Sequence, residues 1–279
     1  MLRIAVPNKG SLSQTAVEML EEAGYATRRD TKQLHLIDEA NDVEFFYLRP
    51  RDIATYVASG ALDVGITGRD LLLDTRQEAR EIEGLGFGGS TFRFAGRPGR
   101  FRELTDLDGV RVATSYSGLV ESFLGERGIS VEVVHLDGAV ESAIELGVAD
   151  AVADVVSTGT TLRQAGLEIF GDVLLRSEAV LIQSPRETEG IDRFQRRLQG
   201  VLVARRYVML DFDLPQNLID AAARIAPGKE SPTISPLRDL DWVAVRVMLP
   251  RKSINKVMDE LYELGARALL VTAIHNARL

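Results

Sequence analysis

The sequence contains no cysteine and only three histidines, which stand far apart at His35, His135 and His275. Disulfide bonds, thiolate zinc sites and a cysteine nucleophile are therefore excluded, and the spacing argues against a histidine metal site. No apolar run approaches the ~20 residues of a membrane-spanning helix, so we expect no membrane partner. The net charge of −8 argues against nucleic acid as the main partner, although it leaves room for a local basic pocket.

A secretory signal is also missing from the pattern. The opening residues, Met1–Val6, reach Pro7 and Lys9 too soon for the apolar core of a signal peptide, so we expect a cytoplasmic protein. A chain of 279 residues with 45% hydrophobic and 27% charged residues has the composition of a globular protein. Its length leaves room for two or three domains.

Short apolar runs alternate with helical patterns through the first two thirds of the chain. Strands are predicted at 2–6, 43–48 and 62–67, and helices at 13–23 and 50–59. A second set has strands at 110–114, 131–136 and 151–156 and helices at 120–125 and 140–147, and a strand at 178–184 is expected to return to the first set. The pattern predicts two α/β lobes, with mainly parallel pairing in the first and a ligand cleft between them.

The order of elements changes after a charged helix at 191–205. Strands are predicted at 207–213, 232–237, 242–249 and 268–274, with helices at 215–225 and 253–264. This β-α-β-β-α-β order is ferredoxin-like, and fold analogy alone suggests a regulatory role for it. We therefore divide the chain into catalytic lobe I (1–89 and 174–204), catalytic lobe II (90–173) and a C-terminal domain (205–279).

The most informative stretch is the apolar run 151–156 together with the turn that follows it, Ser157-Thr158-Gly159-Thr160-Thr161. A strand, a hydroxyl-rich glycine turn and a helix start form a phosphate cradle, because free backbone N–H groups and the helix N-terminus favour an anion. Asp154 lies just before the turn, where a carboxylate can accept hydrogen bonds from sugar hydroxyls. Phosphate and ribose are the expected ligand, although a plain strand-to-helix turn with a threonine cap also fits.

Charged residues follow the first three strands, at the sheet edge where ligands bind in α/β proteins. Lys9 follows the first strand, Arg49 the second, and Arg69 and Asp70 the third. Two cations at matching strand ends suit a pyrophosphate or triphosphate. Each cation alone fits a solvated surface charge, and Asp70 alone fits a helix cap.

Glu141 lies near the start of a predicted helix. A carboxylate in a first turn is favoured by the helix dipole, which would explain it without any ligand. The alternative is contact with a ribose or with a magnesium-bound phosphate.

The segment from Glu141 to Leu162 resembles the signature of the ATP phosphoribosyltransferases, matching it at Gly147, Ala149, Val152, Asp154, Val155, Thr158, Gly159 and Thr161. The resemblance includes segments 7–10, 45–50 and 63–70 and continues to the C-terminal domain, as in the long form of the family. Ordinary type I phosphoribosyltransferases have two adjacent acids before the Thr-Gly loop, whereas Val155 follows Asp154 here. The single acid favours the separate fold of this family, two lobes resembling periplasmic binding proteins.

The resemblance implies the first reaction of histidine biosynthesis, in which N1 of ATP joins C1 of the ribose of phosphoribosyl pyrophosphate (PRPP) and pyrophosphate leaves, with Mg²⁺. Asp154 and Val155 would hold the ribose hydroxyls, residues 157–161 the 5-phosphate, and Lys9 and Arg49 the pyrophosphate or ATP phosphates. Adenine N1 already carries a lone pair, so electrostatic and proximity catalysis are expected more than acid–base catalysis. The candidate catalytic residues are Lys9, Arg49 and Asp154; the candidate substrate-binding residues are Glu141, Asp154, Val155, Ser157, Thr158, Gly159, Thr160, Thr161, Gly10 and Asp70; no metal ligands are assigned.

The resemblance also implies feedback inhibition by histidine, whose contacts in the family fall at Asp213, Thr233, Met248 and Ala268. Long forms are typically active homodimers that become homohexamers when inhibited. From spacing alone, Asp213 is as well explained by a structural acid at a strand end as by a partner of the histidine α-amino group. The other function classes are a two-lobe binding protein, disfavoured by the missing signal peptide, and the effector domain of a regulator, disfavoured by the missing helix-turn-helix.

Overall fold

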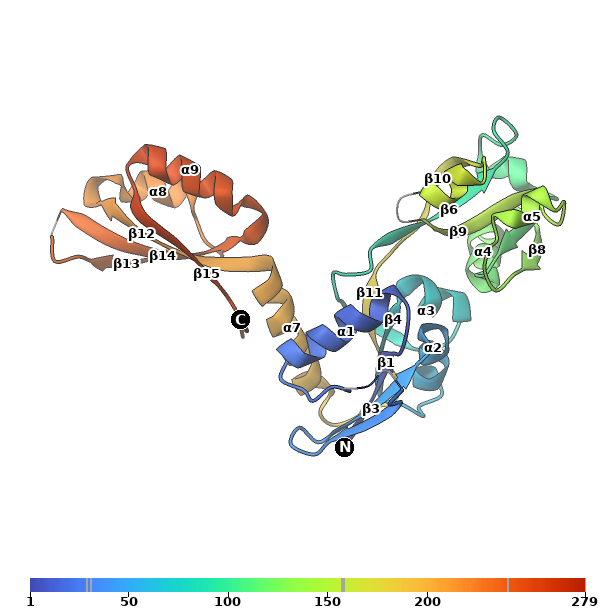
Figure 1. Cartoon of the computed structure of the whole chain (residues 1–279), viewed down its shortest axis with the longest axis horizontal. Coiled ribbons are helices and arrows are strands. Elements are labelled where there is room, and N and C mark those ends of the chain that lie inside the picture. Colours follow the sequence, from blue (N-terminus) through green and yellow to red (C-terminus); the bar gives the residue numbers. More distant parts are fainter. Residues whose placement is uncertain (29, 31, 157–158, 240, 279) are drawn as a thin grey trace. The chain divides into compact units, whose positions relative to one another are not determined.

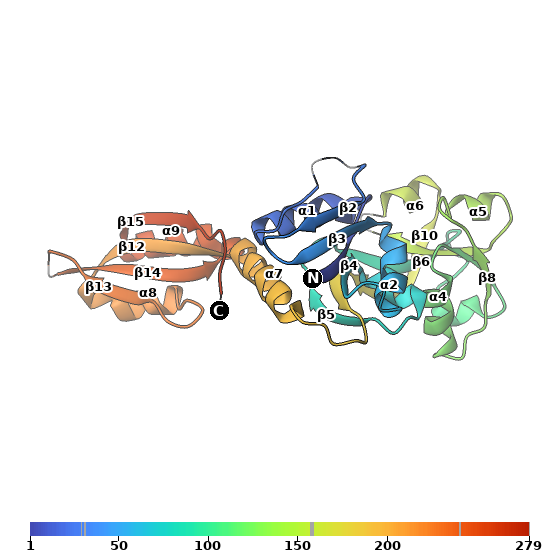
Figure 2. The same cartoon turned by 90° about the horizontal axis from the view of Figure 1, so that it is seen from below.

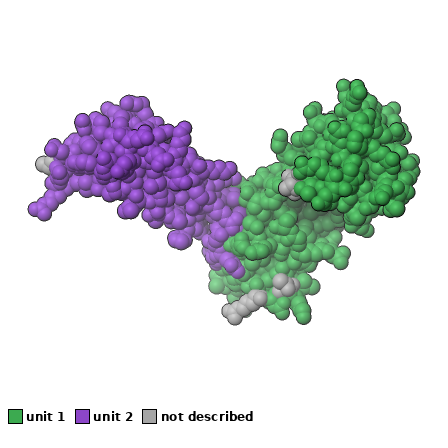
Figure 3. All heavy atoms as spheres, turned by 45° about the horizontal axis from the view of Figure 1, so that its top comes forward, with its two compact units in different colours: residues 1–18, 25–191 green, residues 19–24, 192–279 purple. Residues whose placement is uncertain are grey.

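The computed structural model describes residues 1–28, 30, 32–156, 159–239 and 241–278, and Figures 1 and 2 show its elements in two views. Two compact units divide the chain. The first comprises residues 1–18 and 25–191 and the second residues 19–24 and 192–279, coloured green and purple in Figure 3. Among the described residues, no helix combines the length and the apolarity that crossing a bilayer requires.

A six-stranded sheet forms one half of the first unit, in the order β2-β3-β1-β4-β11-β5. The strand β1 pairs in parallel with β3 and β4, whereas β2, β11 and β5 pair antiparallel with their neighbours. The expected mainly parallel sheet is therefore mixed, because a hairpin adds β2 and the returning strand β11 enters between β4 and β5. The strands are β1 (Leu2–Pro7), β2 (His35–Asp38), β3 (Val43–Leu48), β4 (Val64–Gly68), β5 (Arg80–Gly84) and β11 (Ala179–Gln183).

Three helices follow the strands of this sheet: α1 (Ser11–Glu22), α2 (Pro50–Ala58) and α3 (Arg69–Thr75). Helix α2 begins with a proline, whose fixed φ and missing N–H suit the first helical position. It buries Ile53, Ala54 and Val57 on one face, as the 3.6-residue spacing predicts. Each helix starts directly after a strand, so the strand-to-helix turns collect at one edge of the sheet.

A five-stranded sheet, in the order β10-β6-β9-β7-β8, forms the other half of the first unit. The strand β7 pairs in parallel with β8 and β9, while β6 runs antiparallel to β9 and β10. The strands are β6 (Ser90–Gly96), β7 (Arg111–Thr114), β8 (Glu132–His135), β9 (Ala151–Val156) and β10 (Glu168–Ser177); the helices are η1 (Leu104–Leu107), α4 (Ser117–Gly125), α5 (Ser142–Glu145) and α6 (Thr160–Gln164). The chain passes between the two sheets at β5–β6 and returns at β10–β11, which confirms the predicted return strand.

The second unit holds a four-stranded antiparallel sheet in the order β13-β14-β12-β15, with α8 and α9 on one face (Figure 1). Alternate residues of β12, namely Val208, Leu210, Phe212 and Leu214, are buried in the core beneath the helices. The elements are α7 (Ile191–Arg206), β12 (Tyr207–Pro215), η2 (Gln216–Leu218), α8 (Ile219–Ile225), β13 (Thr233–Pro236), β14 (Trp242–Pro250), η3 (Arg251–Ser253), α9 (Ile254–Leu264) and β15 (Arg267–Ala273). Two α/β lobes and a ferredoxin-like domain confirm the predicted fold class, while the predicted domain boundaries stay predictions.

Candidate active site

A cavity of about 370 Å³ lies at the carboxyl edge of β1 and β4 in the first unit. Four predicted site residues line it together: Lys9 and Gly10 after β1, Asp70 in the first turn of α3, and Val155 on β9. Because β9 belongs to the five-stranded sheet, both sheets contribute to the wall of this cavity. Ligand sites formed between two lobes are common in α/β proteins, so this cavity is the candidate active site.

Asp154, the central residue of the sequence prediction, is half-buried on β9 next to Val155. One carboxylate oxygen, Oδ1, accepts a hydrogen bond from the Val155 N–H at 2.7 Å. Burial raises the pKa of Asp154 above its usual value, the carboxylates of Glu141 and Asp70 raise it further, and the Val155 hydrogen bond opposes them. A partly desolvated carboxylate close to two other acids is typical of a functional site, and it suits a ligand with hydroxyl groups or a cation.

Asp70 is buried and holds together residues from distant parts of the chain. The Asp70 Oδ1 atom accepts a hydrogen bond from the Ser177 hydroxyl at 2.7 Å, and the Asp70 backbone N–H donates to Ser177 Oγ at 3.0 Å. The hydroxyl of Tyr116 forms a further hydrogen bond with Asp70, and burial, reinforced by the Asp70 charge, raises the pKa of Tyr116. The phenol therefore stays protonated and donates to the carboxylate.

Tyr116, Ser177 and Glu178 line the cavity although the sequence analysis did not select them. A signal for Tyr116 was present: the stretch Thr114-Ser115-Tyr116-Ser117-Gly118, rich in hydroxyls and with one glycine, leads from the end of β7 into the start of α4. The same kind of turn follows β9, where it was used to predict the phosphate cradle. Ser177 and Glu178 carried no comparable signal, because their role depends on the return of the chain from one sheet to the other.

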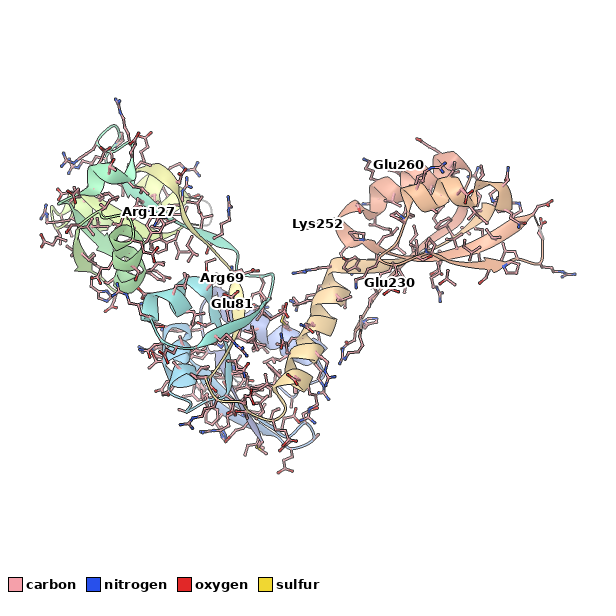
Figure 4. All side chains as sticks on the ribbon, turned by 180° about the vertical axis from the view of Figure 1, so that it is seen from behind. Arg69, Glu81, Arg127, Glu230, Lys252 and Glu260 are labelled. Carbon is pink, nitrogen blue, oxygen red and sulfur yellow. The ribbon has the colours of Figure 1, made fainter. Side chains whose placement is uncertain are left out.

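Arg69 follows β4, and its guanidinium forms ion pairs with Glu81 and Glu178. Its guanidinium donates to Glu81 at 2.7 Å and to Glu178 at 3.1 Å, and the hydrogen bond with Glu81 is the main cause that raises the Arg69 pKa (Figure 4 labels Arg69 and Glu81). Arg69 also lines a neighbouring cavity of about 430 Å³, whose wall includes Ser90 and Arg176. We therefore assign Arg69 to the support of the chain crossing between the sheets.

The two expected catalytic cations differ in position. Lys9 is exposed and lines the cavity, whereas at the end of β3 the lining residue is Pro50, next to the exposed Arg49. Glu141 immediately precedes α5, and its side chain makes no capping hydrogen bond. The helix dipole still explains a carboxylate at this position, while the Glu141 charge lies close enough to Asp154 to raise the pKa of that carboxyl.

The phosphate cradle is described only in part, because Ser157 and Thr158 lie outside the described residues. Gly159 has a left-handed backbone, with φ of 70°, directly before α6. Thr160 and Thr161 are exposed in the first turn of that helix. The described residues thus include a left-handed Gly159 and the start of α6, while the cradle as a whole stays a prediction.

The four residues expected to contact the inhibitor histidine lie on the sheet of the second unit, at separate positions along its strands. Asp213 lies opposite Arg267, the neighbour of Ala268, whose φ of 52° accompanies an irregular register in β15. Met248 instead lies opposite Met209, four residues from Asp213 along β12, or about 13 Å at a rise of ~3.3 Å per residue. Thr233 lies opposite Arg246 on the next strand.

Comparison with known proteins supports this picture. A family model described as ATP phosphoribosyltransferase matches residues 49–200, and a model described as HisG, C-terminal domain, matches residues 204–276. The ATP phosphoribosyltransferases of Pseudarthrobacter chlorophenolicus and Streptomyces coelicolor are 61% and 60% identical, each over 100% of both chains. The solved ATP phosphoribosyl transferase (HisG:HisZ) complex from Thermotoga maritima is 27% identical with a TM-score of 0.63, covering 71% of this chain and 97% of that chain.

Proposed function

Because the chain belongs to the ATP phosphoribosyltransferase family of histidine biosynthesis, we propose that it joins N1 of ATP to C1 of the ribose of PRPP. The products are N1-(5-phosphoribosyl)-ATP and pyrophosphate. The observation that carries this proposal is the half-buried Asp154 beside a cavity lined by Lys9, Asp70 and Val155. A sugar, its phosphates and a second anionic substrate need such a combination of acceptor, cation and shape.

The residues divide between the parts of PRPP. The Asp154 carboxylate accepts hydrogen bonds from the ribose hydroxyls, and the backbone beside it at Val155 positions the ring. The 5-phosphate lies on the turn 157–161, where Gly159 turns the chain into α6 and the backbone N–H groups at the helix start face the anion. Lys9, with Arg49 near the same edge, faces the pyrophosphate or the ATP phosphates.

Catalysis follows from charge placement and proximity. As the bond from C1 to pyrophosphate breaks, negative charge grows on the leaving group and positive charge on the ribose carbon. Lys9 stabilises the first, and the carboxylates of Asp154 and Glu141 stabilise the second. Adenine N1 attacks with its own lone pair, so the chain needs no general base, and the two lobes contribute by holding both substrates in line.

Magnesium fits this site as an ion that binds together with the substrate phosphates. Within the described ranges, no group of three or more histidine, aspartate or glutamate side chains could hold a metal by itself. Mg²⁺ commonly binds through one or two carboxylates and substrate phosphates, and the mutual repulsion of Asp154, Glu141 and Asp70 favours a cation nearby. We therefore propose that Mg²⁺ enters with the pyrophosphate of PRPP and neutralises it, with Asp154 and Glu141 the carboxylates nearest to hold it.

For regulation, we propose that histidine binds to the open face of the C-terminal sheet near Asp213 and Ala268. The carboxylate of Asp213 would pair with the α-amino group of histidine. Met248 lies four residues farther along the sheet than Asp213 and Thr233 lies two strands away, so one histidine would not reach all four residues within one chain. A site shared between copies satisfies this geometry and accords with a homodimer that becomes a homohexamer when inhibited.

The proposal is tested by incubating the protein with ATP, PRPP and Mg²⁺ and measuring pyrophosphate release together with the absorbance of the adduct. Pyrophosphate should appear only when both substrates are present. A two-lobe binding protein would bind PRPP and release no pyrophosphate. That outcome would reject the enzymatic reading while leaving the site itself in place.

A further inference from the structure

Helix α1 runs from the candidate active site into the second compact unit. Lys9, Gly10, Ser11 and Leu12, at its beginning, line the cavity. Residues up to 18 belong to the first unit, whereas residues 19–24, at its end, group with residues 192–279. One continuous helix of 12 residues therefore has its first turn at the cavity and its last turn in the unit that holds the C-terminal domain.

The last turn of α1 is held by a bidentate ion pair. Arg205, near the end of α7, donates from Nε to Glu22 Oε2 at 2.9 Å and from Nη2 to Oε1 at 2.8 Å. Paired hydrogen bonds of this kind fix the orientation of both side chains as well as their distance. Asn276, close to the C-terminus, adds a donor by contacting the Glu22 carbonyl oxygen at 3.4 Å, which satisfies one of the open carbonyls of the helix end.

Arg205 is in turn tied directly to the C-terminal sheet. Helix α7 ends at Arg206 and β12 begins at Tyr207, so no loop separates them. The Arg205 carbonyl also accepts a hydrogen bond from Arg251 Nε at 3.3 Å, which joins it to the start of the segment leading into α9. The strand β12, which carries Asp213, is therefore joined to Glu22 through Arg205.

At the other end, α1 contacts the chain that passes between the two sheets. The side chain of Leu12 lies so close to Gly88 that a Cβ atom at Gly88 would overlap it. Gly88 belongs to the segment between β5 and β6, and Gly88 and Leu12 both line the cavity. The start of α1 and the crossing segment at Gly88 are therefore packed together at the wall of the cavity.

We propose that the Glu22–Arg205 ion pair is a positioning contact, through which histidine bound to the C-terminal domain sets α1, and with it Lys9 and Leu12, against the substrate cavity. This inference rests on the proposed function, including inhibition by histidine. The Glu22 and Arg205 side chains are 42% and 30% exposed. A pair this exposed contributes little to stability, so it can be removed while the fold is kept.

The test compares Glu22→Gln and Arg205→Gln with the natural sequence. Glu260→Gln is the matched control, because Glu260 forms an exposed ion pair with Lys256 on α9, outside the route (Figure 4 labels Glu260). For each protein, kcat and KM are measured without histidine, followed by the histidine concentration that halves the activity. Circular dichroism melting checks that each variant is folded.

Trp242 provides a separate readout of histidine binding, because it is the single tryptophan of the chain and lies opposite Pro215, two residues from Asp213 along β12. Its fluorescence should titrate with histidine in every variant. Coupling between two ligands is reciprocal, so PRPP should weaken histidine binding in the natural protein by the factor by which histidine weakens PRPP binding. In Glu22→Gln and Arg205→Gln we expect that mutual factor to fall by about 2- to 5-fold, as the loss of an exposed ion pair allows, with histidine affinity in the absence of PRPP and basal kcat nearly unchanged.

Charge reversal separates positioning from a simple loss of structure. Glu22→Arg and Arg205→Glu should each lose inhibition, and the double variant, which restores an ion pair with reversed polarity, should regain most of it. If the natural protein is inhibited and the Gln variants are inhibited equally, the coupling role is wrong and the proposed function stands. If the natural protein forms the adduct but does not respond to histidine, the proposed regulation fails and the coupling role fails with it.

Discussion

At the scale of single residues, the proposed chemistry of the site depends on partly buried carboxylates. Asp154 was predicted from its place before a hydroxyl-rich turn, and the structure adds that burial raises its pKa beside Glu141 and Asp70. Burial could not be predicted, because it depends on strands and loops that are distant in the sequence. The partners of Asp70 show the same limit: Ser177 lies 107 residues away along the chain.

Replacing Asp154 by asparagine should weaken PRPP binding by about 10- to 100-fold, because the neutral amide loses charge-assisted hydrogen bonds to the ribose. In the natural protein the raised pKa of Asp154 means that PRPP binding weakens, as pH falls, earlier than it would with a solvated aspartate. Calorimetric titration of PRPP across pH 5 to 8 measures both effects. An unchanged affinity in Asp154→Asn would remove this residue from the site.

The same substitution should leave the melting temperature at pH 7 equal or higher. Because the pKa of Asp154 is higher in the folded state than in the unfolded state, the folded state binds the proton more tightly. The ionised carboxylate therefore lowers the free energy of unfolding at neutral pH. This loss of stability is relieved as pH falls through the raised pKa. Differential scanning calorimetry of both proteins at pH 7 checks the sign. A large loss of stability in Asp154→Asn would show that the charge is structural.

Tyr116→Phe should raise the KM for substrate by about 2- to 10-fold, with the fold intact, because it removes the hydroxyl that donates to buried Asp70 at the cavity wall. Tyr56→Phe is the control, since Tyr56 is an exposed tyrosine on α2. Steady-state kinetics with both substrates gives the result. Equal KM values in Tyr116→Phe and the natural protein would contradict a role at the site.

At the scale of elements, the regular patterns were predictable and the irregular ones were not. Strands β1, β3 and β9 are apolar runs, and α2 and α9 have clear starts and stops, so all were predicted close to their observed bounds. Strand β2 (His35–Asp38) is short and half exposed, and β10 (Glu168–Ser177) carries Gly171 and Asp172 at a shift of register, so neither shows a strand pattern. The mixed pairing of the first sheet depends on the return of β11, which the local sequence does not specify.

Gly159→Ala should weaken PRPP binding by about 5- to 30-fold, because a left-handed backbone costs an L-residue roughly 1–2 kcal/mol and a turn that relaxes to avoid this cost no longer presents its N–H groups to the phosphate. The space around Gly159 would accept a methyl group, with the nearest side-chain atoms at 3.7 Å, so backbone strain is the cause tested. Gly166→Ala is the control, since Gly166 has φ of 68° and no atom within 4 Å of an added Cβ. The control should lose stability alone, and equal PRPP affinity in both variants would contradict the cradle.

At the scale of the whole molecule, a catalytic unit and a sheet with an open face are encoded in one chain. The composition and the order of elements were enough to predict the ferredoxin-like order after residue 206. The residues expected to bind histidine were predicted from the family resemblance and not from the sequence pattern. In the structure Asp213 lies near Ala268, whereas Met248 lies opposite Met209, four residues from Asp213 along β12. The arrangement of residues within a sheet follows from register, which the sequence leaves open.

Asp213→Ala should relieve inhibition by histidine by about tenfold or more while basal kcat changes little, because it removes the charged partner of the α-amino group. Trp242 fluorescence should show the matching loss of histidine affinity. Asp211→Ala is the control, since Asp211 lies on the same strand and pairs with Arg246. Inhibition that persists in Asp213→Ala and disappears in Asp211→Ala would move the site along the sheet.

The central claim is that this chain forms a bond between N1 of ATP and C1 of the ribose of PRPP. The most direct measurement uses ATP labelled with ¹⁵N at N1 and PRPP labelled with ¹³C at C1, followed by NMR of the product. We predict one-bond coupling between the two labels, with one pyrophosphate released for each adduct formed. Pyrophosphate release without that coupling, or no product at saturating substrates and Mg²⁺, would contradict the account.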